Sequence, residues 1–247
     1  MANEVPGGAR WLDVAPDRLG KWLGSFADRH GGLADTPDAG DSVLTVRAAD
    51  GSVAQCQIPF PPLPPAGPGP RPSGLTGVTA RVAAHARADR TVGVFLVRLG
   101  GYAAGVFAGP EQQLVASKVG SRLVHGRSAA GGQSQQRFAR RRAKQASEAL
   151  AAAADCAARV LVPYLGRLDA LVLGGDRRAM SGMSADPRLR PLFDLAVDRF
   201  LTVPDPRLAV LRATPPMYSA VRIRLAETGP GITSPRSPEH RSGSPGG

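Results

Sequence analysis

The order of apolar and polar residues along the chain divides it into short strands and helices. Strands are predicted where apolar residues form short β-rich runs, and helices where apolar residues recur at the three-to-four-residue spacing of one helix face. In the first part of the chain, a strand at 11–14 is followed by a helix over 16–30. Two further strands at 43–48 and 53–58 flank an Asp-Gly pair, which is a strong signal for a hairpin turn.

A longer run of elements follows a proline-rich stretch. In chain order, the pattern predicts a helix at 75–88, strands at 92–99, 102–108 and 114–124, a helix at 134–162, a strand at 168–173, a helical or transitional segment at 191–197, a strand near 200–203, a helix at 206–213 and a strand at 219–225. Helices alternating with apolar strands are typical of an α/β fold. We therefore expect a mixed sheet of about five or six strands with helices packed on it.

Proline sets the expected domain boundaries. Eight prolines fall within residues 59–72, a composition that favours extended polyproline geometry and predicts a semi-rigid linker at 59–73. A ligand for an SH3-type domain is the alternative for this segment. The linker separates a small helix-plus-hairpin appendage at 1–58 from a main domain at 74–226. The tail at 227–247 is rich in Ser, Pro and Gly, and we expect it to be disordered.

The composition of the 247 residues fits a globular protein of ordinary size. Apolar residues make up 43% of the chain but aromatic residues only 5%, so the core is expected to consist mainly of Val, Leu and Ala. The cysteines Cys56 and Cys156 lack metal-binding or redox spacing and are expected to be buried thiols, which fits a reducing cytoplasm. Because the sequence shows no signal-peptide core and no window of membrane-spanning length, we expect a cytoplasmic monomer without a membrane partner.

Positive charge is concentrated in one stretch of the chain. No acidic residue occurs between residues 112 and 147, whereas eight cations do, against a formal net charge of +11 for the whole chain. These cations are Lys118, Arg122, Arg127, Arg137, Arg140, Arg141, Arg142 and Lys144. They surround a glycine pair, Gly131-Gly132, that is followed by Gln133. A cationic patch around a glycine-rich tip predicts contact with a polyanion.

The helix predicted at 134–162 carries arginines at the end where they stabilise it least. Its first turns hold Arg137, Arg140, Arg141 and Arg142, whereas the helix macrodipole favours acidic residues there. An external anion is therefore expected to compensate them, and a solvated basic face is the alternative. The helix is about 40 Å long at 1.5 Å per residue, so its start can lie well away from the core.

The sequence around the glycine pair resembles the catalytic loop of archaeal and eukaryotic class I translation release factors. Here His-Gly-Arg at 125–127 precedes Gly-Gly-Gln at 131–133, and Ser, two further residues and Arg-Phe-Ala-Arg lead into the long helix. The strand at 169–173 with its following glycines and the segment at 186–193 are also similar to the central domain of that family. The resemblance implies an α/β domain, ribonuclease H-like in topology, with a protruding Gly-Gly-Gln loop.

The resemblance covers about residues 75–203, and the differences narrow the family further. In the full release factors His-Gly-Arg runs almost directly into the glycines, whereas residues 128–130 lengthen the loop here. Neither a stop-codon-reading domain nor a third domain is recognised. The chain is therefore similar to the stand-alone Vms-type release factor-like peptidyl-tRNA hydrolases, and its high content of Ala, Arg, Gly and Pro fits their actinobacterial branch.

This resemblance implies codon-independent hydrolysis of peptidyl-tRNA in ribosome rescue. The catalytic residues would be Gly131, Gly132 and Gln133. A glycine pair lets the backbone approach the tRNA end without Cβ clashes, and the backbone N–H of Gln133 can stabilise negative charge on the ester oxygen. The partners would be peptidyl-tRNA and the ribosomal RNA of the large-subunit peptidyl-transferase centre. The residues expected to contact RNA are His125, Arg127, Arg137, Arg140, Arg141, Arg142 and Lys144.

Other interpretations of the sequence stay open. Contact with RNA and packing in the loop are equally favoured for His125. A basic ribosome-binding or RNA-binding module without catalysis is the first rival. A nuclease is the second, but it needs convergent carboxylates for metal ions, and the strands predicted between 92 and 124 offer only Glu111. The four histidines lack metal-ligand spacing, so neither a metal nor a cofactor is expected. Residues 1–58 are candidates for docking to tRNA or the large subunit.

Overall fold

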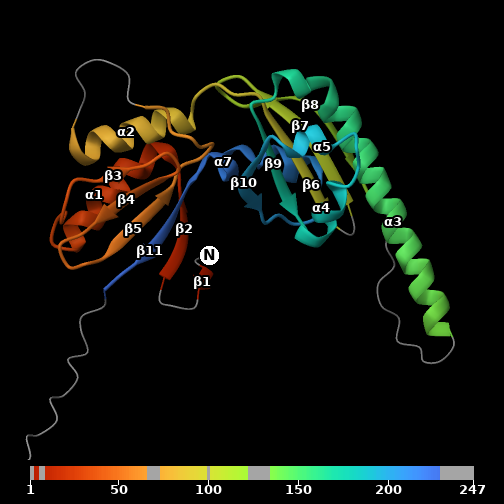
Figure 1. Cartoon of the computed structure of the whole chain (residues 1–247), viewed down its shortest axis with the longest axis horizontal. Coiled ribbons are helices and arrows are strands. Elements are labelled where there is room, and N and C mark those ends of the chain that lie inside the picture. The colour runs from red at the N-terminus through yellow and green to blue at the C-terminus, as the bar shows by residue number, and fades with distance from the viewer. Residues whose placement is uncertain (1–2, 6–8, 66–72, 99–100, 122–133, 229–247) are drawn as a thin grey trace, which may run out of the picture.

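The computed structural model describes residues 3–5, 9–65, 73–98, 101–121 and 134–228, apart from the side chains at 3–5, 38 and 134–143. Figure 1 shows two lobes, each built on its own β-sheet and connected near the top of the view. The long helix α3 (Ser134–Leu161) runs from the second lobe away from the first. The protein is thus of mixed α/β class, as the sequence predicted.

The first lobe contains a six-stranded antiparallel sheet in the order β1-β2-β11-β5-β4-β3. Its strands are β1 (Asn3–Val5), β2 (Ala9–Val14), β3 (Asp38–Ala39), β4 (Val43–Arg47), β5 (Val53–Gln57) and β11 (Val221–Ala226). Its helical elements are the 3-10 helix η1 (Pro16–Arg18), α1 (Leu19–Arg29) and α2 (Gly74–Ala86). One face of the sheet packs against Leu23 and Phe26 of α1 and Val82 of α2, all fully buried. The predicted β4–β5 hairpin is confirmed, with Gly51 in its turn at φ +87.

The make-up of this lobe differs from the expected division of the chain. Both α2 and β11 follow the proline-rich segment in sequence, yet they pack with the elements of residues 1–58. The reason is burial, because a helix and a hairpin alone offer too little apolar surface for a core. Val221, Ile223 and Leu225 of β11 supply it from a central position between β2 and β5. At the start of the chain, β1 pairs with β2.

The second lobe contains a five-stranded mixed sheet in the order β10-β9-β6-β7-β8. Its strands are β6 (Val92–Arg98), β7 (Gly101–Ala108), β8 (Gln113–Gly120), β9 (Ala170–Gly175) and β10 (Ala196–Leu201). Its helical elements are α3, the 3-10 helix η2 (Val162–Arg167), α4 (Arg177–Met183), α5 (Arg190–Phe193), α6 (Leu208–Arg212) and α7 (Pro215–Ser219). Strands β10, β9 and β6 run parallel, and β7 and β8 are antiparallel to their neighbours. The five strands agree with the expected mixed sheet.

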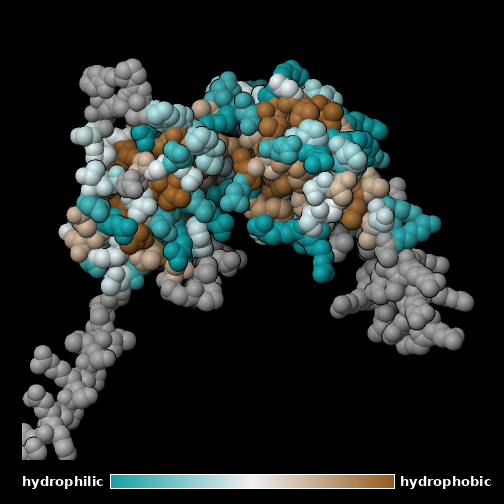
Figure 2. Space-filling view, viewed as in Figure 1, coloured by the Kyte–Doolittle hydropathy of each residue, from teal (hydrophilic) through white to brown (hydrophobic). Residues whose placement is uncertain are grey.

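Helices cover this sheet on both faces. One core cluster lies beneath α3, α4 and the segment before α5, and a second lies beneath α6 and α7. Strand β6 is buried along six of its seven residues, as expected for a strand packed on both sides. In the view of Figure 2, hydrophobic residues are interspersed with hydrophilic ones over both lobes, which is ordinary for a protein surface.

The first half of the proline-rich segment lies against both lobes. The ring of Phe60 meets that of Tyr218 in an edge-on contact with centroids 5.8 Å apart, and the Arg90 guanidinium lies 4.9 Å from the Phe60 ring centre. Leu63 is buried in the core of the first lobe. Residues 59–65 therefore form a packed joint instead of a free extended linker. The expected linker at 66–72 and the expected disordered tail at 229–247 lie outside the described residues.

Within the described chain, one stretch, Lys144–Arg167, is long and apolar enough to cross a membrane by length and composition alone. The sequence pattern did not predict this. Alanine accounts for most of its apolar character, and its buried residues Ala153, Ala157 and Leu161 belong to the core beneath α3. The stretch therefore packs on the second sheet along one side.

The end of β9 generates a prediction about stability. Gly175 has φ +101, and a Cβ there would overlap the carbonyl oxygen of Val97. Gly175→Ala is expected to lower the free energy of unfolding by about 3 kcal/mol, because backbone strain and a steric clash add. Gly166→Ala, where a Cβ meets open space, is the control and should stay within about 0.5 kcal/mol of the wild type. Urea unfolding measures both, and equal midpoints for the two variants would contradict the prediction.

Candidate functional site

Helix α3 is the element on which the predicted site depends. It spans 28 residues, from Ser134 to Leu161, and begins directly after Gln133. The predicted helix at 134–162 is therefore confirmed to within one residue. Figure 1 shows its later turns lying along the second sheet and its first turns extending beyond that sheet. At 1.5 Å per residue the helix is about 42 Å long, so its start lies far from the core.

Small side chains attach the later half of α3 to the sheet. The buried residues of this half are Ala153, Ala154, Cys156, Ala157, Val160 and Leu161. They share a core cluster with Phe95 of β6 and with Ala104 and Val106 of β7. Because half of these helix residues are alanines, the helix backbone can approach the sheet closely. These contacts anchor the later half of the helix to the sheet.

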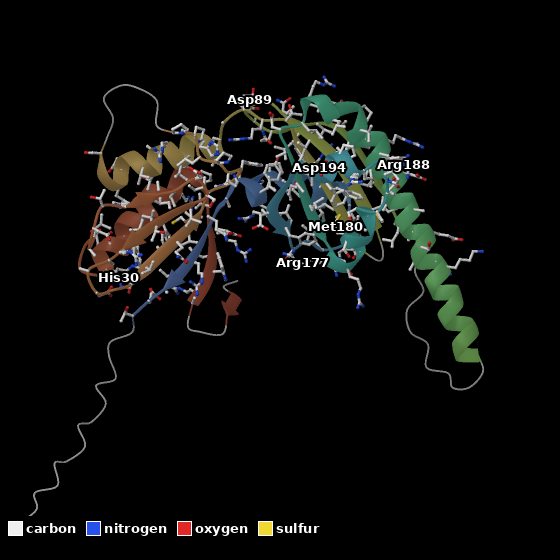
Figure 3. The ribbon with its side chains drawn as sticks, viewed as in Figure 1. His30, Asp89, Arg177, Met180, Arg188 and Asp194 are labelled. Atoms are coloured by element: carbon white, nitrogen blue, oxygen red, sulfur yellow. The ribbon has the colours of Figure 1, made fainter. Side chains whose placement is uncertain are left out.

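An ion-pair network joins α3 to the segment before α5. Nη1 of Arg188 donates to Oδ1 of Asp155 on α3 at 2.8 Å, and Nη2 donates to Oδ2 of Asp186 at 2.7 Å. Figure 3 labels Arg188 beside α3. The hydrogen bonds from Arg188 lower the pKa of the Asp186 carboxyl. The side chains of Arg188 and Asp155 are more than half exposed, so the network fixes orientation more than it adds stability.

The two cysteines are buried, as expected. Burial raises the pKa of the Cys56 thiol to about 12 and also raises the pKa of Cys156. The Cys156 Sγ donates to the carbonyl oxygen of Lys118 on β8 at 3.4 Å. Both thiols are therefore protonated near neutral pH, and neither is suited to act as a nucleophile.

A cavity of about 390 Å³ lies where α3 passes the carboxyl ends of β6 and β9. Tyr102, Leu150 and alanines of α3 give it an apolar lining. Two of its polar groups are already engaged within the protein. Asp176 caps α4 by accepting from the backbone N–H groups of Arg178 and Ala179, and Arg98 donates to the carbonyl oxygen of Val203 at 2.8 Å. We therefore assign no chemical step to this cavity.

The predicted site residues fall into three groups. Those of the loop lie outside the described residues, and they are His125, Arg127, Gly131, Gly132 and Gln133, together with the extra residues 128–130. Four arginines lie on the backbone of the first half of α3 with side chains outside the description, and they are Arg137, Arg140, Arg141 and Arg142. Lys144 is exposed on the same helix. The structure thus places all five helix cations on one element.

The electrostatics of the helix start agree with the expected charge pattern. The first turn of α3 contains no acidic residue, and the first acid along the helix is Glu148. The positive end of the macrodipole and the arginines therefore favour an anion at the same place. Among the residues whose positions are described, no group of three or more His, Cys, Asp or Glu side chains is arranged to hold a metal ion.

Comparison with known proteins identifies the family of the chain. The mixed sheet, the anchored basic helix and the Gly-Gly-Gln before it define a release factor-like protein. The family model of the actinobacterial and chloroflexi VLRF1 release factors matches residues 90–224. Because this match covers more than half of the chain, the protein belongs to that family. A search of curated proteins gave no match.

Two solved structures align with the chain at low overall similarity. The crystal structure of the archaeal translation termination factor aRF1 is 12% identical, with 70% of this chain and 51% of that chain covered and a TM-score of 0.35. A structure described as an archaeal protein is 15% identical, with 87% and 68% covered and a TM-score of 0.32. The chain thus spans about half the length of the termination factor.

The packing of α3 yields a second prediction. Ala157 is fully buried between the helix and the sheet. Ala157→Leu should lower the free energy of unfolding by about 1–3 kcal/mol, because the added atoms force the helix away from the strands. Ala151→Leu, at an exposed position of the same helix, should be nearly neutral. Thermal or urea unfolding compares the two, and an equal loss from both substitutions would argue against close packing at Ala157.

Proposed function

We propose that this protein is a codon-independent peptidyl-tRNA hydrolase that releases nascent peptides from stalled ribosomes or split large subunits in the cytoplasm. One observation carries the proposal. In a member of a release factor family, Gly-Gly-Gln stands directly before a long arginine-rich helix whose later half is packed on the second sheet and whose first turns extend beyond that sheet (Figure 1). The proposed catalytic residues are Gly131, Gly132 and Gln133.

The geometry of α3 suits a substrate that is buried in RNA. An ester inside the peptidyl-transferase centre is reached only by a narrow element that extends from the body of the protein. The turns of the helix before Leu150 supply about 24 Å of reach. Its arginines, with Lys144, would neutralise ribosomal RNA phosphates, which would supply the negative charge that no acidic residue of the first turn supplies. His125 and Arg127 would contact RNA beside the loop.

The proposed reaction is hydrolysis of the ester between the nascent peptide and the terminal ribose of tRNA. The oxygen of water forms a bond to the carbonyl carbon, the bond from that carbon to the ribose oxygen breaks, and the ribose oxygen leaves with a proton that originates from water. The backbone N–H of Gln133 stabilises the negative charge that develops on the carbonyl oxygen. Its side-chain amide confines the water, and orientation contributes much of the rate.

Substitutions in the loop test the catalytic assignment. Peptide release is followed as loss of tRNA-linked peptide, on split large subunits and on whole stalled ribosomes. Gln133→Ala should slow release about tenfold or more but not abolish it, because the backbone N–H survives. Gly132→Ala should slow it at least as much, because a Cβ restricts the backbone. Gln113→Ala, at an exposed position of β8, is the control and should release at the wild-type rate.

Two results of this assay would overturn the proposal. Wild-type rates for both loop variants would remove the catalytic role of the loop. A wild-type protein that binds ribosomes or large subunits but leaves the peptide on tRNA in every case would instead be a non-catalytic binding module.

The arginines of α3 generate a prediction about salt dependence. The triple substitution Arg140→Gln, Arg141→Gln and Arg142→Gln should weaken binding to the large subunit. It should also lower the slope of log affinity against log salt concentration by about 2, because up to three phosphate contacts are lost. The control replaces three exposed arginines elsewhere, Arg87, Arg207 and Arg212, and removes the same charge. An equal change of slope in both triple variants would mean that net charge, and not the helix, determines binding.

A further inference from the structure

The sheet of the first lobe has a second face that α1 and α2 do not cover. Side chains on neighbouring antiparallel strands that lie directly opposite each other share a face. The register places Trp11, Arg224, Gln55 and Thr45 in one row across β2, β11, β5 and β4. Arg222 and Gln57 lie opposite each other in the next row of the same face. These six residues define the open face.

The alternation of burial confirms which way this face points. The residues between those of the open face, among them Ile223, Cys56 and Leu44, are fully buried in the core beneath α1 and α2. In contrast, Arg224 and Gln57 are exposed, and the other members of the open face are partly exposed. Four strands at about 4.8 Å spacing give the row a length of roughly 14 Å. The open face is therefore an accessible, shallow surface with polar side chains.

Its two central arginines are held by uncharged partners. The Arg222 guanidinium lies over the Trp11 ring, 4.6 Å from the ring centre, and Nη1 of Arg224 donates to Oε1 of Gln55 at 3.3 Å. Asp13, opposite Arg222 in the sheet, is paired instead with Arg199 of β10 at 3.0 Å. Across the described residues, no carboxylate lies within ion-pair distance of either guanidinium. Both guanidiniums are thus ordered and without an ion-pair partner among the described residues, which favours an anionic partner.

The kinds of side chain on this face identify the anion. Unpaired RNA bases stack on aromatic rings and on guanidinium planes, and amide side chains form hydrogen bonds with their edges. A tryptophan with an arginine on its ring, a second arginine and two glutamines on one flat sheet supply each of these contacts. The core of a protein–protein interface is likewise rich in Trp and Arg but is largely apolar, whereas Trp11 is the one large apolar side chain among the six residues of the open face. The observations therefore favour RNA over a protein partner.

We propose that the open face binds unpaired nucleotides of large-subunit ribosomal RNA and gives the protein a second RNA contact apart from α3. The ribosome as the source of this RNA rests on the proposed function. The acceptor stem of tRNA is a duplex, which proteins recognise by shape and 2′-hydroxyl contacts, and the unpaired 3′ end of tRNA carries the ester that the loop before α3 would reach. Figure 1 also places the first lobe at the end of the molecule opposite the start of α3.

Equilibrium binding to purified large subunits without peptidyl-tRNA tests this proposal. Arg222→Gln combined with Arg224→Gln should weaken binding roughly tenfold and lower the salt slope by about 1.4, as expected for two phosphate contacts to single-stranded RNA. The control removes two exposed arginines from the helix side of the same lobe, Arg18→Gln with Arg29→Gln. This control should bind like the wild type.

Substitution of the aromatic residue separates stacking from charge. Trp11→Ala should weaken binding roughly tenfold with little change in salt slope, and Trp11→Phe should restore most of the affinity because a ring is kept. Circular dichroism and thermal unfolding identify any variant that fails to fold. Wild-type affinity in both the arginine double variant and Trp11→Ala would overturn the proposal.

Two further outcomes would also overturn it. One is that the variants of the open face bind free deacylated tRNA less tightly than the wild type, while their affinity for the subunit is unchanged. The other is that these variants no longer bind a protein partner of the wild type, while their affinity for the subunit is unchanged. The binding assay uses subunits without peptidyl-tRNA, so it does not depend on whether the protein hydrolyses peptidyl-tRNA. The proposal of RNA binding by the open face and the proposal of peptide release can therefore fail independently.

Discussion

Close packing between the alanine side of α3 and strands β6 and β7 is the contact on which the rest of the structure depends. Because Ala153, Ala154 and Ala157 are small, the helix lies near the sheet and is fixed along its later turns. With the later turns attached in this way, the first turns extend beyond the sheet (Figure 1). They can therefore carry arginines, which would be costly in a core and unfavourable at the positive end of a helix dipole.

The elements that were predicted well are those with strong local signals. Helix α3 keeps one apolar spacing over many turns, and the β4–β5 hairpin has an Asp-Gly turn, so the sequence alone located both. The place of β11 was not predictable, because its alternating pattern is the same in either sheet and only its long-range pairing selects the first lobe. Helices α4 and α7 are too short for a periodic signal.

The same difference between local signals and long-range contacts applies to the candidate site. Its loop and arginines were identified from contiguous sequence, where a rare combination of residues carries the information. The Arg188 network was missed because it joins residues 33 positions apart on different elements. Likewise, the lack of an ion-pair partner for Arg222 and Arg224 among the described residues depends on the register of three strands and on the pairing of Asp13 with Arg199. No local pattern encodes such a relation.

The central position of β11 has a consequence for how the chain is made. The first sheet receives its middle strand from residues near 221, after the entire second lobe has been synthesised. Until then, β2 and β5 each present an unpaired edge and the hydrophobic layer under α1 is incomplete. If the chain folds during synthesis, the second lobe would thus fold first. The first lobe, although it contains the N-terminal residues, would be completed only when β11 has been made.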